Sequence, residues 1–238
     1  MKKVRIYYYN AQGKLTQREE YIRDGDVDGV YFEDHNGKVI PFDEVNISND
    51  HDRKLFKDII YDLIVQAGAH KYVKVYGFSA NYRNKQAGAY SEFNSKSIFL
   101  NTNRAFTNNR YNLINLFEHE KGHLENKTRG LKMHAGVYIN SMNTTAYAKS
   151  TAQHQFSTAA SLANYLYNIY LENNSLDIQT IQGLIDKFNK ENSAGLKIVY
   201  DFNGPNSQGG LELYIKDKKG NRTTDPVKYK EIKDEDEH

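Results

Sequence analysis

Two histidines, His119 and His123, stand four residues apart inside an apolar pattern, and this pair constrains the fold more than any other feature of the chain. The apolar side chains around the pair recur at helical spacing: Leu113, Leu116, Phe117 and Leu124. This periodicity predicts an amphipathic helix that begins at Asn108 or Asn109 and ends before Gly130. Residues four apart on a helix project from the same face, so both imidazole rings are expected to point toward one place.

The whole segment is His119-Glu120-Lys121-Gly122-His123. Two imidazoles at this spacing can bind one zinc ion at roughly 2.0–2.1 Å. Glu120 lies about 100° around the helix from His119, where it can reach a water molecule at the metal without being a ligand. The pattern therefore predicts a catalytic zinc ion with Glu120 as the general base. The alternative is two surface histidines beside a solvated glutamate. Gly122 argues against this alternative. Glycine costs about 1 kcal/mol inside a helix, so its presence calls for a reason, such as the close approach of another backbone to the site.

A catalytic zinc ion needs a third protein ligand and one open position. Residues 126–171 contain no aspartate and no glutamate, which excludes a carboxylate ligand soon after the helix. We predict His134 as the third ligand, because it follows Gly130, where the chain can turn back onto the helix. His154 and Glu172 remain the alternatives.

The His119-Glu120-x-x-His123 motif resembles that of the zincin metallopeptidases, and the order of the predicted elements extends the resemblance over residues 50–135. The resemblance implies an α+β fold with a zincin-like catalytic domain. Such a domain has an amphipathic helix, a small mixed sheet, the motif helix and C-terminal helices. It also implies hydrolysis of a peptide or protein substrate.

In zincins, the last strand before the motif helix commonly borders the cleft and pairs with the substrate backbone. By resemblance, residues 89–93 or 97–101 form that edge. The chain departs from the two large zincin branches after the motif. Asn126 and Arg129 stand where metzincins have a glycine and a third histidine, and the nearest downstream glutamate for a gluzincin ligand is Glu172. The sequence therefore matches neither branch well.

The stretch from His134 to Tyr138 is similar to an H-x-x-V-Y stretch in the compact metallopeptidase domains of bacterial polymorphic toxins. The tyrosine-rich residues 6–14 are similar to repeats found upstream of such domains. This resemblance implies an inhibitor or immunity protein as a partner, in addition to a peptide or protein substrate.

The remaining residues predict a β module before the catalytic domain and a strand pair after it. Two hairpins are expected to turn at Gln12-Gly13 and at Asn36-Gly37, the second being the strongest short hairpin signal. Further strands are expected at residues 72–78, 196–202 and 211–216. Helices with apolar periodicity are expected at residues 55–64, 162–170 and 178–188, the first starting at Ser48-Asn49-Asp50 and stopping at Gly68. Residues 135–156 are small and polar and indicate no clear element. The predicted division is an N-terminal β module (1–48), a catalytic domain (49–193) and a C-terminal β hairpin with a charged tail (194–238).

A second metal site is suggested by Asp24, Asp26 and Asp28, which with Gly29 fit the first half of a calcium loop. The last ligand position should hold a bidentate glutamate, but His35 stands there. We therefore favour a solvated acidic turn over a calcium site.

Composition excludes several classes of protein. The 238 residues include no cysteine, which rules out a disulfide framework, a cysteine nucleophile and cysteine-ligated zinc. The net charge of +2 gives no indication of binding to nucleic acid or to an anionic membrane. No apolar run fits a signal peptide or a membrane span, so we expect a soluble chain, either cytoplasmic or exported as an effector. The alternatives to an enzyme are a non-catalytic zincin-fold binding module, a structural zinc site and an interaction protein without metal.

Overall fold

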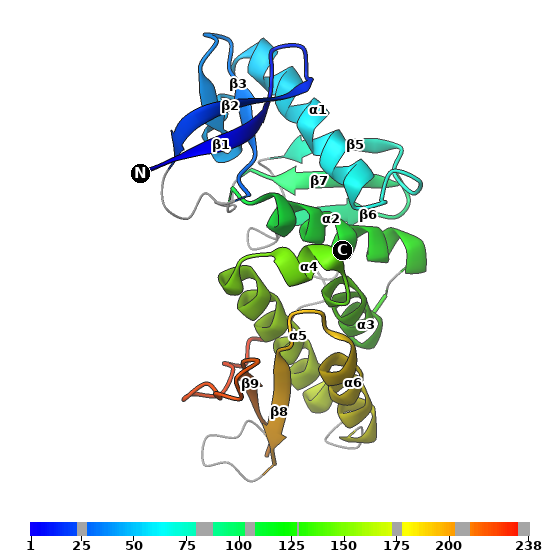
Figure 1. The fold of residues 1–238 in the computed structure, drawn as a ribbon. Helices are drawn as coiled ribbons and strands as arrows, with labels where there is room; N and C mark the ends of the chain where they lie inside the picture. The colour runs from blue at the N-terminus through cyan, green and yellow to red at the C-terminus, as the bar shows by residue number, and fades with distance from the viewer. Residues whose placement is uncertain are drawn as a thin grey trace. The chain divides into compact units, whose positions relative to one another are not determined.

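A computed structural model describes residues 1–22, 28–79, 88–102, 108–127, 129–172, 178–202 and 210–232. These residues form α-helices and three small sheets, which confirms the α+β prediction (Figure 1). The chain divides into two compact units, Met1–Leu124 and Glu125–His238. The domain boundaries expected near residues 48 and 193 stay predictions.

The N-terminal unit begins with a four-stranded sheet made of the two predicted hairpins. The sheet has the order β2-β1-β3-β4, in which each hairpin is antiparallel and β1 runs parallel to β3. Both turns contain a glycine in the left-handed region, Gly13 at φ 72° and Gly37 at φ 74°, where a side chain would be strained. The strands are β1 (Lys2–Tyr9), β2 (Leu15–Ile22), β3 (Tyr31–Glu33) and β4 (Val39–Pro41).

Helix α1 (Asp50–Gln66) begins and ends where local sequence signals predict. The Asn49 side chain caps its first turn by accepting from two backbone N–H groups, and Gly68, at φ 67°, follows its last turn. The apolar side chains of the helix repeat at intervals of one, three and four residues and are all buried: Leu55, Phe56, Ile59, Ile60, Leu63 and Ile64.

Phenylalanine rings connect α1 to the elements on either side of it in the sequence. Phe42, in the short 3-10 helix Phe42–Glu44, stacks on Phe56 with ring centroids 4.3 Å apart. Phe56 also meets Phe78 edge to face at 5.2 Å. Phe42 and Phe56 are fully buried, so they form part of the core of the N-terminal unit.

The second sheet determines which strand can present an edge. It contains β5 (Val75–Ser79), β6 (Ala89–Glu92) and β7 (Ser97–Asn101) in the order β5-β7-β6. β7 pairs with β5 in parallel and with β6 in antiparallel, so it has a partner on both sides. The proposal that residues 97–101 form the substrate-binding edge is therefore wrong. The alternative, residues 89–93, includes β6, which lies at an edge of this sheet.

Helix α2 (Arg110–Asn126) carries the histidine pair. Its first turn is capped by Asn109, whose side-chain oxygen accepts from the backbone N–H groups of Tyr111 and Asn112 at 3.0 and 3.1 Å. The predicted apolar stripe is largely buried, with Leu113, Phe117 and Leu124 at most 5% exposed. The sequence therefore predicted both the start of this helix and the face that packs against the core.

The described residues of the C-terminal unit form four helices and a β hairpin. Its core lies between α3, α5, α6 and the hairpin, and residues such as Ile139, Leu166, Ile185 and Leu213 are buried there. The elements are α3 (Leu131–Met142), α4 (Thr145–Lys149), α5 (Ala152–Glu172), α6 (Ile178–Glu191), β8 (Lys197–Asp201) and β9 (Glu212–Lys216).

The sequence did not predict α3 and α4. Three of the buried positions of α3 hold small or polar residues, His134, Ala135 and Ser141, which a search for apolar periodicity does not count. The buried side chains of α3 also span an arc of about 200° at 100° per residue, too broad for a narrow stripe. The interpretation of residues 135–156 as having no clear element is therefore corrected.

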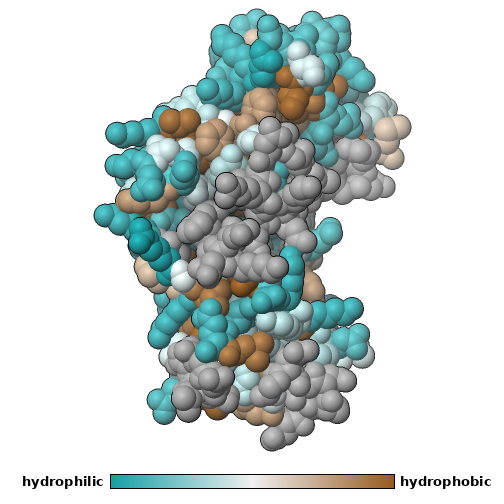
Figure 2. Space-filling view, turned by 180° about the vertical axis from the view of Figure 1, so that it is seen from behind, coloured by the Kyte–Doolittle hydropathy of each residue, from teal (hydrophilic) through white to brown (hydrophobic). Residues whose placement is uncertain are grey.

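Among the residues coloured in Figure 2, hydrophilic ones prevail and hydrophobic ones form small separate patches. The large hydrophobic side chains with the greatest exposure belong to several different elements, as Tyr7, Tyr21, Met133 and Phe156 illustrate. Within the described ranges, no helix is long and apolar enough to cross a lipid bilayer.

Candidate metal centre

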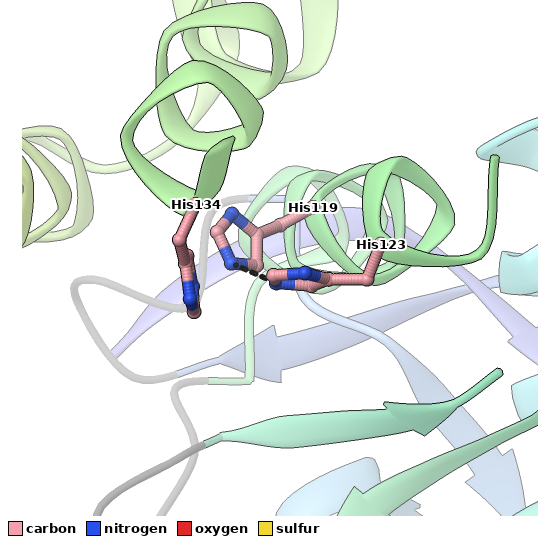
Figure 3. A group of neighbouring side chains, drawn as sticks. All are labelled: His119, His123 and His134. Carbon is pink, nitrogen blue, oxygen red and sulfur yellow. Dashed lines mark hydrogen bonds between the residues drawn. The ribbon is translucent and has the colours of Figure 1, made fainter. Parts of the chain in front are cut away.

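His119 and His123 lie one turn apart on α2 and turn their rings toward each other (Figure 3). Their Nε2 atoms are 3.1 Å apart, and one donates a hydrogen bond to the other. Two nitrogen ligands of a tetrahedral zinc ion, each at 2.0–2.1 Å, lie about 3.3–3.4 Å from each other. The separation of this pair therefore already suits two ligands of one ion.

The protonation state of His123 also suits a ligand. Burial lowers the pKa of this imidazole to about 4, because the positive charge of its protonated form is poorly solvated there. The ring is therefore neutral at neutral pH. A neutral imidazole has a nitrogen lone pair for a metal ion, so binding does not first have to remove a proton.

His134 lies on α3, where neighbouring aromatic rings restrict its orientation. The side chain is buried, and its ring packs 4.3 Å from the ring of Tyr165 on α5 and 5.4 Å from that of Tyr138. Tyr138 follows His134 by four residues, so both rings lie on one face of α3. Such packing reduces the number of side-chain conformations that metal binding would have to select.

One ring nitrogen from each of His119, His123 and His134 lies within 4.8 Å of the other two, so the three histidines form a group that could hold a metal ion (Figure 3). Three imidazoles without a thiolate fit a divalent transition metal.

The alternative third ligands are not part of this group within the described ranges. His154 is partly exposed near the start of α5, and Glu172 is exposed at the end of that helix. Of the residues suggested for calcium, Asp24 and Asp26 lie outside the described residues. Asp28 is described, and its backbone carbonyl accepts from the N–H of Arg110 at 2.7 Å. The preference for a solvated acidic turn over a calcium site therefore stays a prediction.

Glu120 is buried beside the histidine pair, with 6% of its surface exposed. Burial raises the pKa of its carboxyl group to about 7, whereas hydrogen bonds from the hydroxyl and the backbone N–H of Ser91 oppose that rise. A carboxyl group in this environment can both accept and release a proton near neutral pH.

Ser91 is the residue at this site that the sequence did not reveal. It lies in β6, 29 positions before Glu120, and neither a motif nor a periodicity marks it. Only the packing of β6 against α2 brings the two residues together, so a search along the sequence had no signal for it.

Comparison with known proteins identifies the family of the chain. No curated protein and no solved structure matches the chain. A family model described as metallopeptidase toxin 2 matches residues 7–197, a region that contains all three histidines, Glu120 and Ser91. Because the match extends over most of the 238 residues, the chain belongs to the metallopeptidase toxin 2 family.

Proposed function

We propose that the protein hydrolyses peptide bonds with one zinc ion held by His119, His123 and His134, and with Glu120 as the general base. The family supports a metal-dependent peptidase in general. The observation that carries the proposal is the group of three imidazole nitrogens within 4.8 Å of one another, next to a buried carboxyl group.

The choice of zinc rests on the chemistry of the three ligands. Imidazole nitrogens suit zinc, copper, iron and nickel, whereas calcium and magnesium prefer oxygen. Three protein ligands and one open position are typical of catalytic zinc, while structural zinc sites have four protein ligands. When bound, the ion supplies Lewis-acid chemistry that polarises the substrate carbonyl group and acidifies water.

Glu120 moves the proton. It takes one proton from the attacking water molecule as the water oxygen bonds to the carbonyl carbon of the substrate. It then gives this proton to the amide nitrogen as the C–N bond breaks, so the products are a carboxylic acid and an amine. The imidazole rings of His119, His123 and His134 would hold the ion and take no part in this proton transfer.

The substrate is proposed to be a peptide or protein, as the family description indicates. For the same reason, we propose that an immunity protein inhibits the enzyme in the cell that makes it. An inhibitor that covers the histidine group would act by excluding the substrate.

The test is Glu120→Gln, with hydrolysis of a fluorogenic peptide library and zinc content measured on the same samples. The variant should lose at least about 10³-fold in kcat/KM, since general-base catalysis and the charge of Glu120 are both removed, and it should retain one zinc per chain. Glu125→Gln is the matched control, because Glu125 is an exposed glutamate on the same helix. Full activity of Glu120→Gln would refute the role of this residue.

A further inference from the structure

Strand β6 has an outer edge whose backbone groups point away from β7. The backbone N–H of Asn101 donates to the carbonyl of Gly88 at 2.9 Å, and in this register Ser91 lies opposite Ile98. Backbone groups in an antiparallel pair alternate in direction along the strand. The N–H and C=O of Gly88 therefore face β7, and those of Ala89 and Ser91 face outward.

Helix α2 lies against this strand. A Cβ atom built on Gly88 would stand 3.2 and 3.3 Å from the two methyl carbons of Leu116, so the strand backbone closely approaches the helix there. Leu116 and Glu120 are one turn apart and share a face of α2. Two contacts place the strand along this face of α2. Gly88, just before β6, approaches Leu116, and Ser91, within β6, is bonded to Glu120.

Ser91 uses both of its donors on the buried carboxylate. Its outward N–H and its hydroxyl group each donate a hydrogen bond to Glu120. Two donors from one residue restrict both the position and the rotation of the carboxylate, because a backbone N–H on a paired strand cannot move independently. Hydrogen bonds to a charged group are also stronger than those between neutral groups.

We propose that Ser91 is a positioning residue that holds the Glu120 carboxylate in the orientation needed to take a proton from water. This inference rests on the proposed function, since it assigns Ser91 a role in the same reaction. Ser91 is proposed to act through Glu120, to which both of its donors are bonded. A second consequence is that the outward Ser91 N–H donates to Glu120 and does not pair with a substrate backbone.

The experiment compares Ser91→Ala, Ser91→Thr and the control Ser95→Ala in the zinc-loaded chain. Ser95 lies in the turn between β6 and β7, and its hydroxyl bonds to Glu92 and Ser97. Ser91→Ala should lower kcat about 10-fold, since one charge-assisted hydrogen bond is lost, with KM and zinc content unchanged. Ser91→Thr should recover most of the activity because it restores the hydroxyl group, and Ser95→Ala should match the wild type.

A double-mutant comparison separates positioning from a structural role. Glu120→Asp shortens the side chain and removes the contact, so adding Ser91→Ala to it should change its residual kcat by less than twofold. A 10-fold loss in that background would overturn the proposal, as would Ser91→Ala activity within twofold of the wild type, or a loss that Ser91→Thr does not restore. An inactive wild-type chain would instead refute the proposed function itself.

Discussion

Removing the charge of Glu120 should stabilise the metal-free protein at alkaline pH. The carboxyl group is 6% exposed, and burial raises its pKa from an ordinary value of 4.5 to about 7. The folded state thus holds this proton more tightly than the unfolded state does. The contribution of this proton binding to the free energy of unfolding is fully present below pH 4.5 and is lost as the pH rises through about 7.

The size of the effect follows from the two pKa values. At about 1.36 kcal/mol per pH unit, the interval between 4.5 and about 7 corresponds to ~3 kcal/mol. Glutamine has nearly the same shape, can accept from both donors of Ser91 and does not titrate. Glu120→Gln should therefore raise the free energy of unfolding by up to ~3 kcal/mol at pH 8 and by very little at pH 4.5.

Urea unfolding followed by circular dichroism, with a chelator present, measures this difference at both pH values. His123 titrates in both proteins, so its contribution cancels in the comparison. Glu125→Gln, at an exposed position of the same helix, is the matched control at both pH values. If Glu120→Gln were no more stable than the wild type at pH 8, burial of the charged Glu120 carboxylate would not destabilise the folded protein.

Three further substitutions test the fold by urea unfolding. Phe56→Ala should cost about 3–5 kcal/mol, because the side chain is fully buried between Phe42 and Phe78, and a loss below about 1 kcal/mol would contradict this packing. Asn109→Ala should cost about 1 kcal/mol by removing the cap of α2, and an unchanged midpoint would show that the cap does not form. Gly183→Ala should add about 0.5–1 kcal/mol, because a Cβ atom meets nothing within 4 Å in α6, so a destabilised variant would be inconsistent with the helix.

The parts of the fold that the sequence predicted are those determined by local chemistry. The Asn36-Gly37 turn, the Asn49 cap of α1 and the Asn109 cap of α2 all involve groups within a few residues of one another. Apolar periodicity then identified the buried faces of both helices. The helix α3 was missed because several of its buried positions hold small or polar side chains, whose burial depends on tertiary packing.

The residues of the candidate site also divide into those that the local sequence determines and those that tertiary packing brings together. The spacing of His119 and His123 is a property of one helix, so the sequence alone places their rings on one face. His134 was preferred because residues 126–171 contain no acidic residue and because it follows Gly130, where the chain can turn back onto the helix. Ser91 and the choice between β6 and β7 as the edge depend on strand order, which the strand patterns did not encode.

The most direct test of the proposed centre is the zinc content of the purified chain and of its ligand variants, combined with X-ray absorption at the zinc edge. We expect one zinc per chain in the wild type, with three imidazole nitrogens and one oxygen from solvent at roughly 2.0–2.1 Å. His134→Ala should lose the ion, whereas His154→Ala and Glu172→Gln should retain it. Full zinc retention by His134→Ala, or a fourth protein ligand in the wild type, would contradict a catalytic three-histidine centre.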